Sequence, residues 1–156
     1  MEIKRITKDD LVMNDETSQY EYKEKLQFDG HIEIDGDLGR VKFAAGVWAT
    51  GHIWTKAGTG IEAGWGIEAG RGIEAGWGSE AGRGIKAGWG IEAGRGIKAG
   101  ESIEAGWGIV TFYSGGIFAK QITALRIAVG FNITEIQTIT ADVRKGVVIL
   151  GTVKAP

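Results

Sequence analysis

From residue 61 to residue 108 the chain repeats a six-residue unit eight times, with isoleucine first in seven of the units, a charged residue second and alanine third. In an extended backbone the first and third residues point to one face and the second points to the other. We therefore expect short strands whose isoleucine and alanine face a core and whose glutamate or lysine faces solvent. Two glycines in a six-residue unit would cost a helix roughly 2 kcal/mol, so the pattern disfavours helices.

A short, constant period predicts identical units that stack on their neighbours. The fold class that follows is all-β: a β-solenoid, or β-helix, built from six-residue sides with irregular capping strands at both ends. Two units per coil would give twelve residues and two sides, and three units would give eighteen residues and three sides. The sequence leaves the handedness open.

Charge favours the eighteen-residue coil. Stacked residues lie about 4.8 Å apart, and a twelve-residue coil would stack arginine on arginine and glutamate on glutamate. An eighteen-residue coil instead pairs Trp with Arg in cation–π contacts: Trp65 with Arg83, Arg71 with Trp89, and Trp77 with Arg95. It also alternates Glu68, Lys86 and Glu104. The twelve-residue alternation of Trp and Arg supports the two-sided alternative.

The regions around the hexads divide the chain into three parts. Residues 1–26 form a polar N-terminal segment, in which Thr7 is a candidate cap of a short helix. Residues 27–121 form the solenoid, with degenerate coils before the perfect hexads at 61–108. Residues 122–156 form C-terminal capping and oligomerisation strands, with a hairpin turn expected at residues 144–146.

The glycines on either side of the fifth residue indicate a corner in each unit. We expect them to adopt left-handed or bulged dihedrals that other residues avoid. The fifth residue then projects outward between them.

Composition narrows the function classes. The net charge of −2 argues against a basic nucleic-acid-binding surface, so nucleic acid is not expected as a partner. There is no cysteine to form disulfides or a cysteine-based zinc site. No apolar stretch reaches the roughly 18 residues of a membrane span, and the first residues lack the apolar core of a signal peptide. We expect no membrane association and a cytoplasmic location.

The Ile-Glu-Ala-Gly hexads resemble three groups of β-solenoid proteins. Left-handed hexapeptide acyltransferases share the period, but place the small inward residue before the aliphatic one and use a catalytic histidine. Polymer-forming bactofilins are similar in size and in their irregular ends. Small hexad-repeat proteins of Gram-positive phages and mobile elements are a looser likeness, and some of these resemble inhibitors of host defence. Each resemblance covers roughly residues 30–115.

The candidate binding residues are the fifth-position tryptophans and arginines. They are enriched at interface hot spots, yet the same tryptophans would also serve simply to shield the corners. The set is Trp65, Arg71, Trp77, Arg83, Trp89, Arg95 and Trp107. His31 and His52 lack partners at metal-ligand spacing and are assigned structural roles. Ser79 interrupts the isoleucine column. No catalytic residue, cofactor or metal is expected.

These observations predict a non-enzymatic interaction protein that presents a Trp/Arg/Glu ladder to a protein partner of unknown identity. The phage-protein resemblance implies an inhibitor of a host defence protein. A self-assembling, bactofilin-like scaffold is the alternative, and a hexapeptide-type acyltransferase is the third possibility. The apolar C-terminal strands favour a homodimer.

Overall fold

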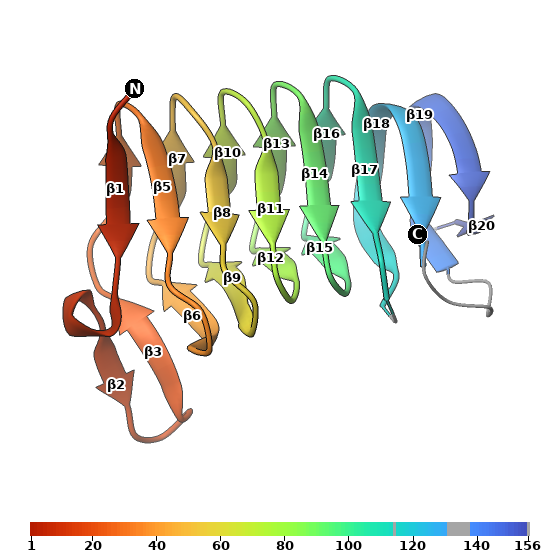
Figure 1. Ribbon diagram of the computed structural model, residues 1–156. Helices are drawn as coiled ribbons and strands as arrows, with labels where there is room; N and C mark the ends of the chain where they lie inside the picture. Colours follow the sequence, from red (N-terminus) through yellow and green to blue (C-terminus); the bar gives the residue numbers. More distant parts are fainter. Residues whose placement is uncertain (114, 131–137, 156) are drawn as a thin grey trace.

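The computed structural model describes residues 1–113, 115–130 and 138–155. Short strands stack in parallel coils and form a β-solenoid of about six turns, which confirms the expected fold class. Figure 1 shows the coils in sequence order along one axis, from β1 at the N-terminal end to β19 and β20 at the other. No helix in the described part of the chain is long and apolar enough to cross a membrane.

In the regular stretch each coil contributes three strands, and equivalent strands pair in parallel to form three rows. The β10 row contains β4 (Leu26–Phe28), β7 (Val47–Ala49), β10 (Ile67–Ala69), β13 (Gly84–Ala87) and β16 (Ser102–Ala105). The β11 row contains β1 (Ile3–Ile6), β5 (His31–Ile34), β8 (Ile53–Thr55), β11 (Ile73–Ala75), β14 (Gly90–Ala93) and β17 (Gly108–Thr111). The β12 row contains β3 (Gln19–Tyr22), β6 (Gly39–Phe43), β9 (Thr59–Ala63), β12 (Ser79–Ala81) and β15 (Ile97–Ala99).

The pairing register supplies the coil length. Ile67 pairs with Ile85, and Ile85 pairs with Ile103, so paired residues are eighteen positions apart in the hexads. In the degenerate coils the separation is longer, because Leu26 pairs with Val47 and Val47 with Ile67. The expected three-sided cross-section stays a prediction, whereas the stacking of Trp and Arg positions follows directly from this register.

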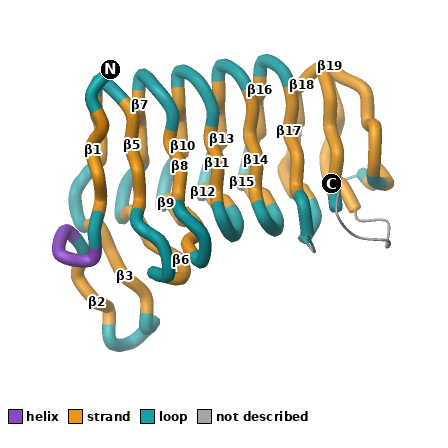
Figure 2. The backbone as a smooth tube through the Cα atoms, in the orientation of Figure 1, coloured by secondary structure: helices purple, strands orange, loops and turns teal. Residues whose placement is uncertain are grey.

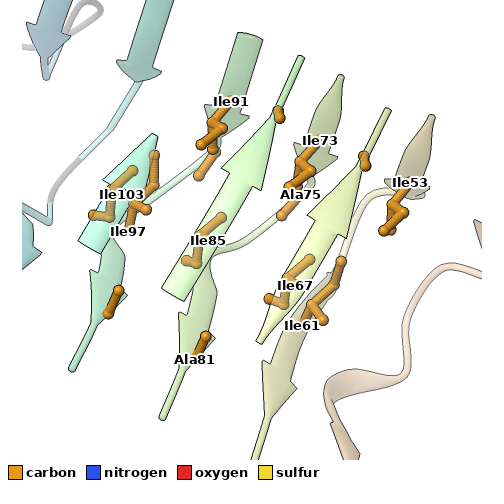
Figure 3. Close-up of a cluster of buried hydrophobic side chains, with 14 of the residues drawn as sticks. Ile53, Ile61, Ile67, Ile73, Ala75, Ala81, Ile85, Ile91, Ile97 and Ile103 are labelled. Atoms are coloured by element: carbon orange, nitrogen blue, oxygen red, sulfur yellow. The ribbon is translucent and has the colours of Figure 1, made fainter. Parts of the chain in front are cut away.

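The core is a set of stacked aliphatic columns. Ile67, Ile85 and Ile103 are fully buried, and the alanines two positions later are at most 7% exposed. Figure 3 shows the isoleucine side chains projecting from strands of different rows into the shared interior. The inward assignment of the first and third hexad positions is therefore confirmed.

The N-terminal coil carries a small antiparallel addition, which lies beside β3 in Figures 1 and 2. A 3-10 helix spans Lys8–Asp10, and β2 (Val12–Asn14) pairs antiparallel with β3. The expected cap is present: the Asp10 carboxylate accepts hydrogen bonds from the Thr7 N–H at 2.8 Å and the Thr7 hydroxyl at 3.0 Å. These bonds hold the pKa of Asp10 below its ordinary value.

Stacking extends on both sides of residues 27–121. At the N-terminal end, β1 already pairs with β5. At the C-terminal end, β18 (Ile117–Val129) pairs in turn with β15, β16 and β17, and β19 (Thr138–Leu150) pairs with β18 in parallel. The last strand, β20 (Thr152–Lys154), pairs with the start of β19.

The expected hairpin at residues 144–146 is wrong. β19 continues through these residues, and its Lys145 pairs with Thr123 of β18. The glycine signal there did not mark a turn, because a full-length neighbouring strand already supplies hydrogen-bond partners along the segment. Part of the expected first strand of that hairpin lies outside the described residues.

The expected role of the glycines that flank the fifth residue is also corrected. Between residues 61 and 108, all of which the structure describes, no glycine has a left-handed φ. The fourth-position glycines are instead required by close approach of stacked corners: a Cβ on Gly88 would lie 2.1 Å from the Gly70 carbonyl oxygen. The sixth-position glycines are less confined, and a Cβ on Gly84 would lie 3.4 Å from its nearest neighbours.

Candidate functional site

The seven predicted site residues do not lie on one surface. They divide among three corners, defined by the strand rows that each corner connects, and every corner forms its own backbone ladder. Arg71, Trp89 and Trp107 stack on the β10–β11 corner, and Trp77 and Arg95 stack on the β11–β12 corner. Trp65 and Arg83 stack on the third corner, where the chain passes from the β12 row to the β10 row of the next coil. A partner that contacts one corner therefore contacts two or three of these residues.

All three predicted Trp–Arg pairs are confirmed as cation–π contacts. The Arg83 guanidinium lies 5.7 Å from the Trp65 ring centre, Arg71 lies 5.4 Å from Trp89, and Arg95 lies 5.0 Å from Trp77. The indoles remain accessible, from 40% exposed at Trp77 to 74% at Trp107. The arginines thus bind to the solenoid's own tryptophans, which leaves Trp107 as an exposed indole beyond the last Trp–Arg pair on the β10–β11 corner.

The β10–β11 corner borders a groove of about 1000 Å³. On one side stand Trp89 and Trp107, and on the other stand Glu92 and Val110 of the β11 row. The sixth-position residues between them are Gly90 and Gly108, which supply backbone but no side chain. The absence of a side chain between two walls is what opens the groove.

Later coils extend this groove toward the C-terminal end. Phe112, which follows β17, lines it together with Leu125, Arg126 and Ala128 of β18 and Ile149 of β19. Leu125 is 51% exposed and Ile149 is 60% exposed, so their apolar atoms face water. Neighbouring exposed apolar side chains rimmed by charged residues make this groove a candidate interaction site.

Sequence reasoning missed these lining residues. Val110 occupies the second hexad position, where glutamate or lysine stands in the earlier units, and it stacks directly on Glu92. The signal was therefore a departure from the repeat. Leu125 and Ile149 had no such signal, because they lie beyond the hexads and only pairing of β18 and β19 carries them to this face.

Charge on the outer faces is mostly compensated between coils. In the β12 row Arg40 lies 3.3 Å from Glu80 and 3.8 Å from Glu62, and Lys98 lies 2.9 Å from Glu80. In the β10 row Lys86 lies 3.7 Å from Glu104, as the expected alternating column requires.

The β11 row departs from this compensation at the groove. Glu74 stacks directly on Glu92, and among the described residues neither forms an ion pair. Partial desolvation, and then the Glu74 carboxylate, raise the pKa of Glu92 above its ordinary value. A cation placed beside these carboxylates would relieve both effects.

A second, smaller groove of about 230 Å³ borders the β11–β12 corner between Trp77 and Glu80. Arg95, Lys98 and Phe118 also line it. Its charged groups are engaged, because Arg95 lies over Trp77 and Lys98 pairs with Glu80. The geometry therefore favours the larger groove as the binding surface.

The two histidines occupy the sixth hexad position in the first coils of the β11 row, in place of glycine. Their rings stack 5.5 Å apart, a mutual contact that sequence reasoning missed. His31 Nδ1 accepts a hydrogen bond from the His52 N–H at 3.0 Å, and His52 Nδ1 accepts one from the Gly72 N–H at 3.2 Å. His52 also meets the edge of Trp89, with ring centres 5.5 Å apart.

These contacts support the structural role expected for the histidines. Their imidazoles fill the β11 row where later coils are open at Gly90 and Gly108, so they lie beside the N-terminal limit of the groove. Within residues 1–113, 115–130 and 138–155, no group of three or more His, Cys, Asp or Glu side chains is arranged to hold a metal ion.

The arrangement combines an apolar groove, two accessible indoles and an uncompensated carboxylate pair on a rigid coil stack. Such a site is suited to holding an apolar segment next to a positive charge. Comparison of the chain with protein-family models, with curated proteins and with solved structures found no match.

Proposed function

We propose that the chain is a non-enzymatic interaction protein that binds a protein partner through the groove beside Trp89 and Trp107. The observation that carries this proposal is the exposure of Trp107, Leu125 and Ile149 on one continuous lining. Large rigid side chains at the centre of an apolar patch are the usual anchors of protein interfaces. The solenoid supplies the rigidity, because Glu92, Val110 and Leu125 stand on paired strands. Trp89 and Trp107 stand on corners whose backbone N–H groups donate to the preceding coil.

The proposal narrows the expected Trp/Arg ladder to one corner. Trp65 and Trp77 lie on other corners, where each packs against an arginine. The hypothesis that the partner is a host defence protein rests on the resemblance of the hexads to phage and mobile-element proteins. A cytoplasmic location remains part of the proposal.

Capture of partners from a lysate of the source organism tests the groove. The bait proteins are the wild type, a Trp107→Ala/Leu125→Ala variant, and Trp65→Ala as the matched control, since Trp65 is similarly exposed on another corner. We expect the wild type and Trp65→Ala to capture the same protein and the groove variant to lose it. Equal capture by all three baits would place the binding surface elsewhere.

A specific observation favours self-assembly as the second candidate. Among the described residues, the outer edge of β19 pairs with β20 only at Thr138–Thr140, and Val147 is 66% exposed. An open strand edge is a template for another chain, so a homodimer through the C-terminal strands is the corresponding proposal. Light scattering after size-exclusion chromatography tests it, with loss of the dimer expected in Val147→Lys. A monomeric wild type would overturn it.

A further inference from the structure

The groove beside Trp89 and Trp107 has a shape that limits what fits. Its lining comes from β14, β17, β18 and β19, which pair in succession, and from the corner residues Trp89 and Trp107 that precede β14 and β17. Three spacings of about 4.8 Å give a length of roughly 14 Å, which matches about four residues of an extended peptide at roughly 3.3 Å each. The narrow floor of Gly90 and Gly108 lies between two walls of side chains.

The charges at the groove limit the occupant further. Glu92 lines its N-terminal part and stacks on Glu74 of the preceding coil, and neither carboxylate has a cationic partner among the described residues. The face of Trp89 is already covered by Arg71 at 5.4 Å. Beyond Glu92 the wall becomes apolar at Val110, Leu125 and Ile149, and Arg126 is the cation of the lining.

Building on the proposed function, we propose that the groove binds an extended peptide segment that carries a lysine or arginine next to apolar residues. The cation lies against Glu74 and Glu92, and the apolar side chains cover Trp107, Val110 and Leu125. The physical reason is complementarity: the cation removes a like-charge repulsion that the solenoid leaves uncompensated. The apolar neighbours cover surface that otherwise faces water.

Elsewhere on the solenoid, a stacked pair of carboxylates is crossed by a basic side chain of the chain itself. Glu62 and Glu80 stack on successive coils, and Arg40 approaches both of them. Glu74 and Glu92 have the same stacked arrangement without the crossing cation. A partner's lysine or arginine would therefore take the role that Arg40 has beside Glu62 and Glu80.

Fluorescence anisotropy with three labelled peptides tests the proposal. The probes are fluorescein-Ser-Leu-Val-Lys-Val-Leu-Ser-amide and the same peptide with glutamine or glutamate in place of lysine. We expect the wild type to bind the lysine peptide about tenfold more tightly than the glutamine peptide. The Glu74→Gln/Glu92→Gln variant should bind both equally, and Trp107→Ala should lose affinity for every probe.

The outcomes separate this inference from the proposed function. Equal affinity for lysine and glutamine peptides, with loss in Trp107→Ala, would leave the groove as a binding site and overturn the charge assignment. Preference for the glutamate peptide would show that Arg126 decides the charge and would also overturn it. No binding of any peptide overturns the inference, and the lysate capture then decides the proposed function by itself.

Two further controls keep the test decisive. Thermal melts check that the Gln variant folds, and removal of a like-charge pair is expected to leave its melting temperature equal to or above that of the wild type. Light scattering checks whether a second copy occupies the groove. A wild-type dimer that Trp107→Ala dissociates would overturn the proposal, because the occupant would then be the chain itself.

Discussion

At the residue scale, the stacking of coils explains both the cost of a residue that breaks the repeat and the need for glycine at the corners. Ser79 occupies an isoleucine position between Ile61 and Ile97, is 2% exposed, and has a hydroxyl with no hydrogen-bond partner in the described structure. Gly88 occupies a corner where stacked backbones nearly touch. Ser79 therefore lowers the stability of its column, whereas Gly88 cannot be replaced by a residue with a Cβ unless the stacked backbones move apart.

Restoring isoleucine at position 79 should stabilise the protein. Ser79→Ile removes an unsatisfied buried hydroxyl and refills an aliphatic column, so the free energy of unfolding should rise by about 1–3 kcal/mol. Chemical denaturation measures the change. Ser79→Ala is the matched control, since it removes the hydroxyl without adding packing and should give a smaller gain. A decrease for Ser79→Ile would show that the column has no space for it.

The two glycine positions of a unit should respond differently to alanine. Gly88→Ala places a Cβ 2.1 Å from the Gly70 carbonyl oxygen and should destabilise the protein by about 3 kcal/mol because the coils must separate. Gly84→Ala, with its nearest atoms at 3.4 Å, should cost much less. Thermal melts of the two variants provide the comparison. Equal losses would contradict the close-approach explanation.

At the scale of the strand rows, side chains in equivalent positions interact along the solenoid axis. The histidine stack of β5 and β8 is one such column, in which each ring accepts a backbone hydrogen bond through Nδ1. Burial first, and then the charges of His52 and Arg71, lower the pKa of His31 below its ordinary value of 6.5. The folded state therefore prefers the neutral ring more strongly than the unfolded chain does.

This preference predicts a pH dependence. Because the folded-state pKa of His31 is depressed, its contribution to stability is fully present above pH 6.5, its unfolded value, and is lost as the pH falls through the folded pKa. The melting temperature should therefore fall as the pH is lowered from about 8 to about 5, a range above that in which most carboxylates titrate. His31→Asn keeps an acceptor but no titratable ring, so its melting temperature should vary less. An identical slope in this variant would refute the assignment.

At the scale of the whole molecule, the solenoid is held by contacts between successive coils, so its ends decide its solution behaviour. At the N-terminal end, the 3-10 helix and β2 adjoin the first coil near the lower end of β1, as Figure 2 shows, and β2 pairs with β3. At the other end β19 covers β18, whose Ile122 and Ile127 are fully buried. Removal of β19 would open a strand edge that runs the length of β18.

A chain truncated after Gly130 should therefore aggregate or form concentration-dependent oligomers. A chain truncated after Gly151, which loses only β20, is the control and should behave as the full chain does. Light scattering and thermal melts of both truncations measure the difference. A soluble, monomeric first truncation with an unchanged melting temperature would show that β19 is not needed as a cover.

The six-residue period by itself determined the β-solenoid, the buried isoleucine and alanine columns, and the outward fifth position. These features are local, because the alternation of an extended backbone decides which side chains share a face. The sequence also favoured the eighteen-residue register, and with it the three Trp–Arg contacts, but left the twelve-residue alternative open. That prediction came from comparing the charges that each coil length would stack.

Only the tertiary structure decided where these residues stand relative to each other. A twelve-residue register would have gathered Trp65, Trp77 and Trp89 on one corner, whereas the observed pairing sends them to three. The groove depends on the same long-range pairing, because Trp89, Val110 and Ile149 are far apart in sequence and meet only when successive coils stack. Register is a property of whole coils, set by the sum of packing and charge along each column, and a repeat that satisfies several registers locally does not choose among them.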